Sequence, residues 1–261
     1  MKLSGYFLSL LMTYSLAAYG ACNDQFIDEV RHGLGYHEEL YYRDRLTACT
    51  PHPAMLGVNI VAIARRQKGT EIGDSDVMGT YSLDISLVND KTGKTLKHQL
   101  FPKKLYWDGT EFDGMRIDTT NYNIATGVRA FGIRVGYSTA RFAYEEPLSI
   151  FMVRGSKIVE VLSNADMLIH FDRRIRECRN EARDATRTIG ISSGRTHGFY
   201  DLLVTEELID THEELMQDEN SESNSCQTKV DKKEIKKYLL RFDGKKYVIP
   251  QEMTSFECRI C

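Results

Sequence analysis

Tyr81-Ser82-Leu83-Asp84-Ile85-Ser86-Leu87 is the stretch that decides the fold class, because apolar and polar residues alternate strictly along it. Successive side chains of a β-strand point to opposite faces of a sheet, so this period of two predicts a strand with one buried and one wet face. Residues 89–93, Asn-Asp-Lys-Thr-Gly, form a turn signal that leads to a second strand candidate at 94–101. The two segments together predict an antiparallel hairpin.

Short strand candidates separated by turn signals continue along most of the chain, whereas no alternation of strands and helices indicates a parallel sheet. The sequence therefore predicts a mainly β protein with an antiparallel β-sandwich or barrel-like fold. We expect the main β domain at 54–171 and a smaller C-terminal β subdomain at 188–261. The further strand candidates are 58–65, 115–118, 128–137, 148–153, 158–162, 188–191, 199–204, 238–242 and 246–249.

The segment 21–53 is expected to be mainly helical. Asn23 or Asp24 can cap a helix, and Gly33 and Gly35 can end it. A second short helical turn is expected at 37–46, before the Thr-Pro-His-Pro sequence at 50–53 stops it. The apolar residues of the first helix are spaced to share one face; they are Phe26, Ile27, Val30 and Leu34.

Residues 1–20 have the pattern of an export signal. Lys2 gives a positive start, an uncharged apolar stretch follows, and Ala18-Tyr19-Gly20 places small residues, Ala18 and Gly20, at cleavage spacing. A membrane anchor is the alternative, but a spanning helix needs about 20 apolar residues and polar residues interrupt this segment. Gly20-Ala21-Cys22 leaves open a lipid anchor on Cys22. We therefore expect the mature protein in the periplasm or secreted, and in contact with a membrane only through such a lipid.

The six cysteines are an even set, which suits disulfide bonds in an exported chain. Cys22 and Cys49 bracket the N-terminal segment and are expected to pair with each other. Cys178 is expected to pair with one of the later cysteines, Cys226, Cys258 or Cys261. A lipid on Cys22 would instead leave an odd number of thiols.

Two charged segments interrupt the strand pattern. Residues 172–187 interleave arginines with acids three or four apart, which favours a solvated helix or a linker. Residues 206–225 contain no Lys or Arg and favour a mobile acidic loop. This loop is the candidate surface for a protein partner, through Glu206, Glu207, Asp210, Glu213, Glu214, Asp218, Glu219 and Glu222.

Residues 190–194, Gly-Ile-Ser-Ser-Gly, match the nucleophile pattern of some hydrolases, which would place catalysis among Ser192, His197 and Asp201. A helix is expected behind such a serine, but strand residues follow it, so we predict no catalytic residues. His197 and Asp201, even on one face of a strand, would lie about 13 Å apart, too far to chelate one ion directly. We predict no metal site and no cofactor.

The segments Gly198-Phe199-Tyr200-Asp201-Leu202 and Phe242-Asp243-Gly244-Lys245-Lys246-Tyr247 resemble the C-terminal region of exported bacterial proteins of uncharacterised function. In that region the Gly-x-x-Asp-Leu strand and the Phe-Asp-Gly-x-x-Tyr hairpin are similar to one degenerate blade of the FG-GAP type. The resemblance implies β structure. It does not imply calcium binding, because Thr196-His197-Gly198 stands where such repeats carry their acidic run.

The sequence predicts an exported binding protein without enzymatic activity, of the immunity or inhibitor type, directed against a secreted toxin or an envelope hydrolase. An envelope hydrolase with an active site around Ser192, His197 and Asp201 is the alternative, and a purely structural envelope component is a third possibility. The formal net charge of −3 gives no reason to expect nucleic acid as a partner.

Overall fold

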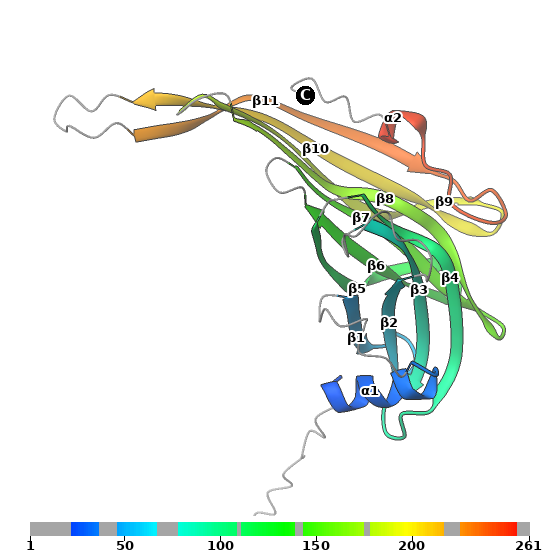
Figure 1. Ribbon diagram of the computed structural model, residues 1–261. Coiled ribbons are helices and arrows are strands. Elements are labelled where there is room, and N and C mark those ends of the chain that lie inside the picture. Colours follow the sequence, from blue (N-terminus) through cyan, green and yellow to red (C-terminus); the bar gives the residue numbers. More distant parts are fainter. Residues whose placement is uncertain are drawn as a thin grey trace, which may run out of the picture.

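The computed structural model describes residues 22–36, 46–66, 78–108, 111–138, 143–174, 178–216 and 225–254. The protein is mainly β, with two antiparallel sheets of four and seven strands and few helices, which confirms the predicted fold class (Figure 1). Neither helix in the described ranges is long and apolar enough to cross a bilayer.

Sheet A has its four strands in chain order, each antiparallel to the next. The strands are β1 (Thr47–Pro51), β2 (Val58–Arg66), β3 (Met78–Asn89) and β4 (Thr95–Asp108). Helix α1 (Asp24–Gly33) lies against this sheet, and the Asn23 side chain caps it by accepting a hydrogen bond from the Phe26 amide (2.8 Å). The predicted helix and its cap are confirmed, but the segment 21–53 also contains strand β1.

Sheet B follows the order β11-β10-β9-β8-β7-β6-β5, so consecutive strands are neighbours here too. It curls into a half-barrel, and β5 contacts β9 and β10. A second short helix, α2 (Gln251–Thr254), follows the last strand. The strands are β5 (Glu111–Ala125), β6 (Val128–Ser138), β7 (Ala143–Arg154), β8 (Lys157–Arg174), β9 (Asn180–Thr196), β10 (Phe199–Met216) and β11 (Ser225–Leu240).

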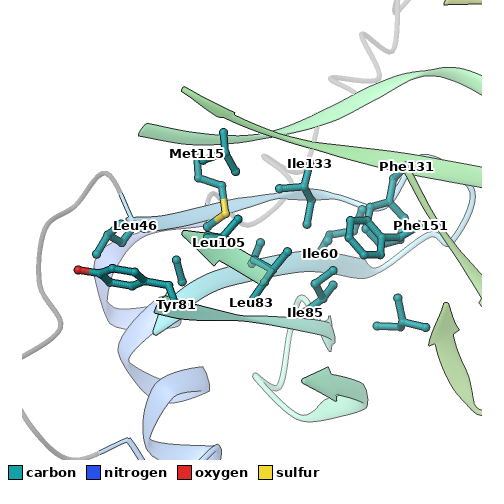
Figure 2. Packing of buried hydrophobic residues seen from close by; sticks show 14 of the residues in the cluster. Leu46, Ile60, Tyr81, Leu83, Ile85, Leu105, Met115, Phe131, Ile133 and Phe151 are labelled. Carbon is teal, nitrogen blue, oxygen red and sulfur yellow. The ribbon is translucent and has the colours of Figure 1, made fainter. Parts of the chain in front are cut away.

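Apolar side chains of sheet A and of β5–β8 meet in the main core (Figure 2). Leu83 and Ile85, from the alternating stretch that predicted the fold, are fully buried there opposite Phe131 and Phe151. The opposite face of β6–β8 contributes to a second core with Leu202 and with residues that follow β11. Strands β6–β8 therefore carry apolar side chains on both faces, as the middle layer of the molecule.

The face of β3 that was expected to be wet is buried. Asp84 and Ser86 alternate with the core residues as predicted, but α1 covers this side of the sheet and packs Val30 against Val61 and Val88. Burial of Asp84 is tolerated because its carboxylate is hydrogen-bonded: the Tyr36 hydroxyl donates to it at 2.6 Å.

Glycine is required at one point where β6 bends past its neighbours. A Cβ atom on Gly132 would lie 2.6 Å from Leu148 Cδ1 and 3.1 Å from Asp118 Cβ, closer than packed atoms approach. Glycine inside a strand typically marks such a close approach of a neighbouring segment.

The two charged segments differ from the prediction. The expected helix or linker at 172–187 is strand up to Arg174 and again from Asn180, and the expected acidic loop is strand β10 up to Met216. The reason is pairing with oppositely charged neighbours, described below. Residues 175–177 and 217–224 lie outside the described ranges, and with them Asp218, Glu219 and Glu222. The last predicted hairpin is formed only in part. Its second segment, 246–249, is not a full strand and pairs through an isolated bridge between Phe242 and Tyr247.

Two disulfides join cysteines of the described residues. Cys22 is bonded to Cys49, as predicted, and Cys178 is bonded to Cys226, one of the later cysteines. The sulfur of Cys22 is used in this bond, so the disulfide and a lipid on the same sulfur exclude each other. Disulfides are consistent with an oxidising compartment outside the cytoplasm. Cys258, Cys261 and the predicted export signal at 1–20 lie outside the described residues.

Candidate functional site

Strands β8–β11 continue beyond the body of the molecule as a long ribbon, and Figure 1 shows its β10 and β11 extending away from sheet A. We call this ribbon the arm and define it as residues 168–174, 180–187, 205–216 and 225–237. Cross-strand pairing continues along it, with Thr205–His212 opposite Thr188–Glu181 and Thr205–Met216 opposite Lys237–Ser225. The arm is therefore an extension of sheet B, and no second sheet packs on it within the described ranges.

In the arm, the acidic strand β10 pairs with arginines of β9 on one side and with lysines of β11 on the other. Arg183 of β9 binds Asp210 of β10 through two hydrogen bonds, from Nε to Oδ1 at 2.6 Å and from Nη2 to Oδ2 at 2.9 Å. On the other side of β10, Lys233 of β11 forms an ion pair with Glu207. Paired carboxylates do not repel one another as a bare acidic run would, so the run that predicted a mobile loop forms a regular strand instead.

The root of the arm contains a buried ion pair. Arg187 Nε donates to Glu206 Oε2 at 2.6 Å, and both residues are almost fully buried. The guanidinium also donates to the carbonyl oxygens of Asp166 (2.8 Å) and Met253 (2.9 Å), and the Tyr238 hydroxyl donates to Glu206 Oε1. Burial and the nearby Glu206 carboxylate raise the pKa of Tyr238 to about 12. A charged pair with this many partners tolerates burial and fixes β9, β10, β11 and α2 together.

A histidine near the far end of the arm lies between two carboxylates. His212 Nδ1 is 2.6 Å from Asp231 Oδ1, and Nε2 is 3.0 Å from Glu214 Oε1. Hydrogen bonds to Glu214 and Asp231 raise the pKa of His212 above its usual value. A cavity of about 670 Å³ opens beside it, with both signs of charge in its lining, including Arg179, Glu181, Arg183, Asp210 and Glu213.

The disulfide Cys178–Cys226 fixes the far part of the arm. Cys178 lies between β8 and β9, and Cys226 lies near the start of β11, so the bond spans β10. It closes a sequence separation of 48 residues, which in the chain-entropy view restricts mainly the unfolded chain. The far end of β9 is held as well, because Asn180 Nδ2 donates to Glu213 Oε2 at 2.7 Å. Ion pairs and a covalent bond thus supplement the small apolar cluster of Ile169, Ala185 and Leu208 within the arm.

Strand β11 presents an exposed edge and an exposed apolar stripe. It is the last strand of sheet B, and among the described residues no strand pairs with its outer edge. Val230, Ile235 and Leu239 are 64%, 62% and 40% exposed. Their cross-strand partners on β10 are Thr211, Glu207 and Leu203. These partners are separated by even numbers of residues on a strand, so the three apolar side chains share one face. We call them the apolar stripe.

Of the eight acidic residues predicted to bind a partner, the five within the described ranges all lie in β10 and are engaged within the arm. Glu206, Glu207 and Asp210 have the partners given above, Glu213 accepts from Asn180, and Glu214 pairs with Lys229. The exposed feature of the arm is the edge of β11, which the sequence reasoning did not identify. The signal present in the sequence was a segment, 229–239, in which isolated apolar residues are interspersed with lysines.

The residues of the alternative hydrolase site share one hairpin but form no triad. The Ser192 hydroxyl accepts a hydrogen bond from the Gly194 amide (3.2 Å), and the buried Asp201 accepts one from the Thr196 hydroxyl (2.7 Å). His197 lies in the turn between β9 and β10 with a φ of 51°, and no hydrogen bond joins it to Ser192 or Asp201, all of which lie in a described range. The contacts of this hairpin are those of a structural turn.

No group of three or more His, Cys, Asp or Glu side chains in the described ranges is arranged to hold a metal ion. His212 lies within hydrogen-bond distance of two carboxylates, Asp231 and Glu214. Glu214 also forms an ion pair with Lys229.

Two further polar clusters lie in the body, and the sequence reasoning missed both. In the first, Asp118 accepts hydrogen bonds from Arg134 Nε (2.7 Å) and the Tyr122 hydroxyl (2.9 Å), and Arg134 and Arg116 both bind Glu146. Burial acts to raise the pKa of Asp118, but hydrogen bonds from Thr120, Arg134 and Tyr122 outweigh it and lower this pKa to about 2. The second is centred on Asp84.

The second cluster joins Asp84 to three side chains from separate elements. His98 Nε2 lies 2.7 Å from Asp84 Oδ1, the Tyr36 hydroxyl binds Oδ2, and Arg65 stacks over the Tyr36 ring at 4.7 Å. Burial and the hydrogen bond to Asp84 raise the pKa of Tyr36 above its usual value. The cluster ties the segment after α1 to strands β2, β3 and β4.

Comparison of the chain with models of known protein families, with curated proteins and with solved structures gives no match. The resemblance of the C-terminal region to exported bacterial proteins therefore stays a prediction.

Proposed function

We propose that the protein is an exported binding protein of the periplasm or envelope surface, and that the arm is the part of it that contacts a partner protein. The observation that carries this proposal is the apolar stripe on β11. Exposed apolar side chains gathered on one face of a protruding element are typical of interaction sites. The stripe lies on β11, the edge strand of sheet B, whose outer side pairs with no strand in the described ranges, and Val230 and Ile235 of the stripe lie in the arm.

The construction of the arm supports a role in binding. Interfaces bind tightly when their elements are ordered before contact, because less conformational entropy is lost. The Cys178–Cys226 disulfide and the Arg183–Asp210 and Arg187–Glu206 pairs order the arm in the free protein. In this proposal the acidic residues of β10 hold the arm together, and the outward side chains of β11 bind the partner.

We further propose that binding is of the immunity or inhibitor type. A stiff projecting ribbon can enter a cleft of a secreted toxin or an envelope hydrolase and block access to it. This assignment predicts that the captured partner is an enzyme, and that its turnover falls in proportion to the fraction of enzyme molecules to which the arm is bound.

The test is capture of partners from envelope extracts by the oxidised protein, followed by identification of what is retained. The double variant Val230→Asp/Ile235→Asp should reduce capture about tenfold or more, the effect expected when interface anchors are removed. The matched control is Leu56→Asp/Leu96→Asp, because these leucines are 91% and 50% exposed but lie outside the arm. Equal capture by both double variants, or no specific partner at all, would contradict the proposal.

A further inference from the structure

We infer that β11 captures an extended, acidic segment of the partner protein by strand addition, so that the segment becomes an eighth strand of sheet B. This inference rests on the proposed function and names the chemistry of its partner. An edge strand offers a row of backbone N–H and C=O groups that an incoming strand can bind. β11 supplies 16 residues of such an edge, most of them exposed.

The charge on β11 selects the sign of the incoming strand. Lys229 and Lys233 are each matched by a carboxylate of β10, Glu214 and Glu207. The other three lysines of β11 form no ion pair with a carboxylate of β10 in the described ranges. Lys232 and Lys236 both approach Glu234, at 2.8 and 3.8 Å, and Lys237 has no ion-pair partner in the described part of the chain. Positive charge is therefore in excess between 232 and 237.

These lysines lie on both faces of the strand. Lys232 and Lys236 are opposite Asp210 and Glu206, whereas Lys233 is opposite Ile209. Successive residues of a strand alternate between faces, so a strand added at this edge meets lysines both above and below the sheet. Carboxylates at neighbouring positions of the incoming strand would each lie near a lysine, whereas basic residues there would be repelled on both faces.

The same lysines argue against a second copy of this chain as the occupant. Pairing two β11 edges would bring two sets of five lysines together, and edge lysines are a common device against such pairing. An incoming acidic strand would instead be attracted to these lysines. Discrimination between partners then comes from the charge, and the backbone supplies hydrogen bonds that any strand could make.

The apolar stripe gives the incoming strand a second requirement. The register of β10 and β11 shifts between Asp210 and Thr211, where Asp231 is left without a direct partner. This bulge keeps Val230 on the same face as Ile235 and Leu239. A partner strand with apolar side chains on that face would cover the stripe. The expected segment is therefore acidic overall, with apolar residues at alternate positions.

The test uses the oxidised full chain and three synthetic twelve-residue peptides, with binding measured by fluorescence anisotropy. One peptide alternates Glu with Val, the second alternates Lys with Val, and the third is the Glu peptide with an N-methyl group on every residue, so that neither of its edges can donate backbone hydrogen bonds. We expect the Glu peptide to bind at least about tenfold more tightly than the Lys peptide, with an affinity that falls as salt is added. The N-methylated peptide should lose binding, because it cannot complete the ladder.

Charge reversal at the edge separates this mechanism from simple attraction. The variant Lys236→Glu/Lys237→Glu should bind the Glu peptide at least about tenfold more weakly and prefer the Lys peptide. The matched control Lys91→Glu/Lys94→Glu makes the same change in net charge at the exposed turn between β3 and β4 and should bind as the unaltered protein does. Circular dichroism of both variants checks that the fold is retained.

Three results would overturn the inference. They are equal binding of the Glu and Lys peptides, full binding of the N-methylated peptide, and a dimer of this chain that the Lys236→Glu/Lys237→Glu change disrupts. If any of these occurred while capture from extracts still required Val230 and Ile235, strand addition would be wrong and the proposed function would stand. If the Glu peptide bound as expected but capture did not depend on those residues, the proposed function would be wrong instead.

Discussion

The body and the arm are parts of one molecule that are stabilised in different ways. In the body, sheet A packs on β5–β8 with fully buried apolar side chains such as Leu83, Phe131 and Phe151. In the arm, a small apolar cluster of Ile169, Ala185 and Leu208 is accompanied by cross-strand ion pairs and one disulfide. Pairing of charges along neighbouring strands thus helps to hold a single layer of strands, whose outer edge, β11, has no neighbouring strand in the described ranges.

The largest effect is expected in the body. Phe131→Ala removes a fully buried ring that stacks on Phe151 at 6.0 Å between centroids, and should lower the free energy of unfolding by about 3–5 kcal/mol. Ile235→Ala on the arm should cost less than about 0.5 kcal/mol, because the side chain is already exposed. Urea denaturation of both variants measures the two losses of unfolding free energy. Similar losses would contradict the proposed difference between the body and the arm.

The next effect tests the buried pair at the root of the arm. Arg187→Met leaves the Glu206 carboxylate buried without its cation and should cost about 3 kcal/mol. In the double variant Arg187→Met/Glu206→Met the isolated charge is gone, so much of that stability should return. Unfolding of the single and double variants gives the coupling between the two side chains. A single variant as stable as the unaltered protein would show that the pair does not hold the arm.

Removal of the arm disulfide should lower the free energy of unfolding by about 2–4 kcal/mol. Cys178→Ser/Cys226→Ser is expected to make residues 178–226 much more susceptible to protease, because the far end of the ribbon is no longer tied across β10. The control Cys22→Ser/Cys49→Ser should leave cleavage in this range unchanged, since that bond ties the chain before α1 to β1 in the body. Mass spectrometry of the fragments locates the cuts.

The smallest of these effects concerns acid pH and the body. The folded pKa of Asp118, about 2, is below its ordinary value of 3.8, so its stabilising contribution is present above pH 4 and is lost as pH falls towards 2. The shift corresponds to about 2 kcal/mol. Asp118→Asn should remove this part of the pH dependence. The test is to measure the free energy of unfolding of both proteins at pH 5 and pH 2.5. If the variant lost as much stability between these pH values as the unaltered protein, the effect would not come from Asp118.

Sequence reasoning succeeded where apolar periodicity and burial agree. The alternation at 81–87 predicted β3, and the spacing of Phe26 and Val30 predicted α1, with Asn23 or Asp24 as its cap. For β10 it predicted only the first part, 199–204, because the inward positions further along include Glu206 and Asp210 and interrupt the apolar alternation.

The arginines of β9 misled the prediction for a related reason. Arg183 and Arg187 are four residues apart, a spacing that puts side chains on one face of a helix but equally on one face of a strand. Only the positions of Asp210 and Glu206 on the neighbouring strand decide between the two, and that pairing is not local in sequence. The candidate site was hidden in the same way, because an edge is defined by the strand order of the whole sheet.

The most direct test of the account is amide hydrogen exchange of the oxidised protein with and without a saturating amount of the Glu peptide. We expect residues 206–216 to exchange slowly in the free protein, and added peptide to protect amides of 225–240 while exchange in the body stays unchanged. Exchange of 206–216 at the rate of an unstructured chain, or peptide protection that falls on the body instead of on β11, would contradict it.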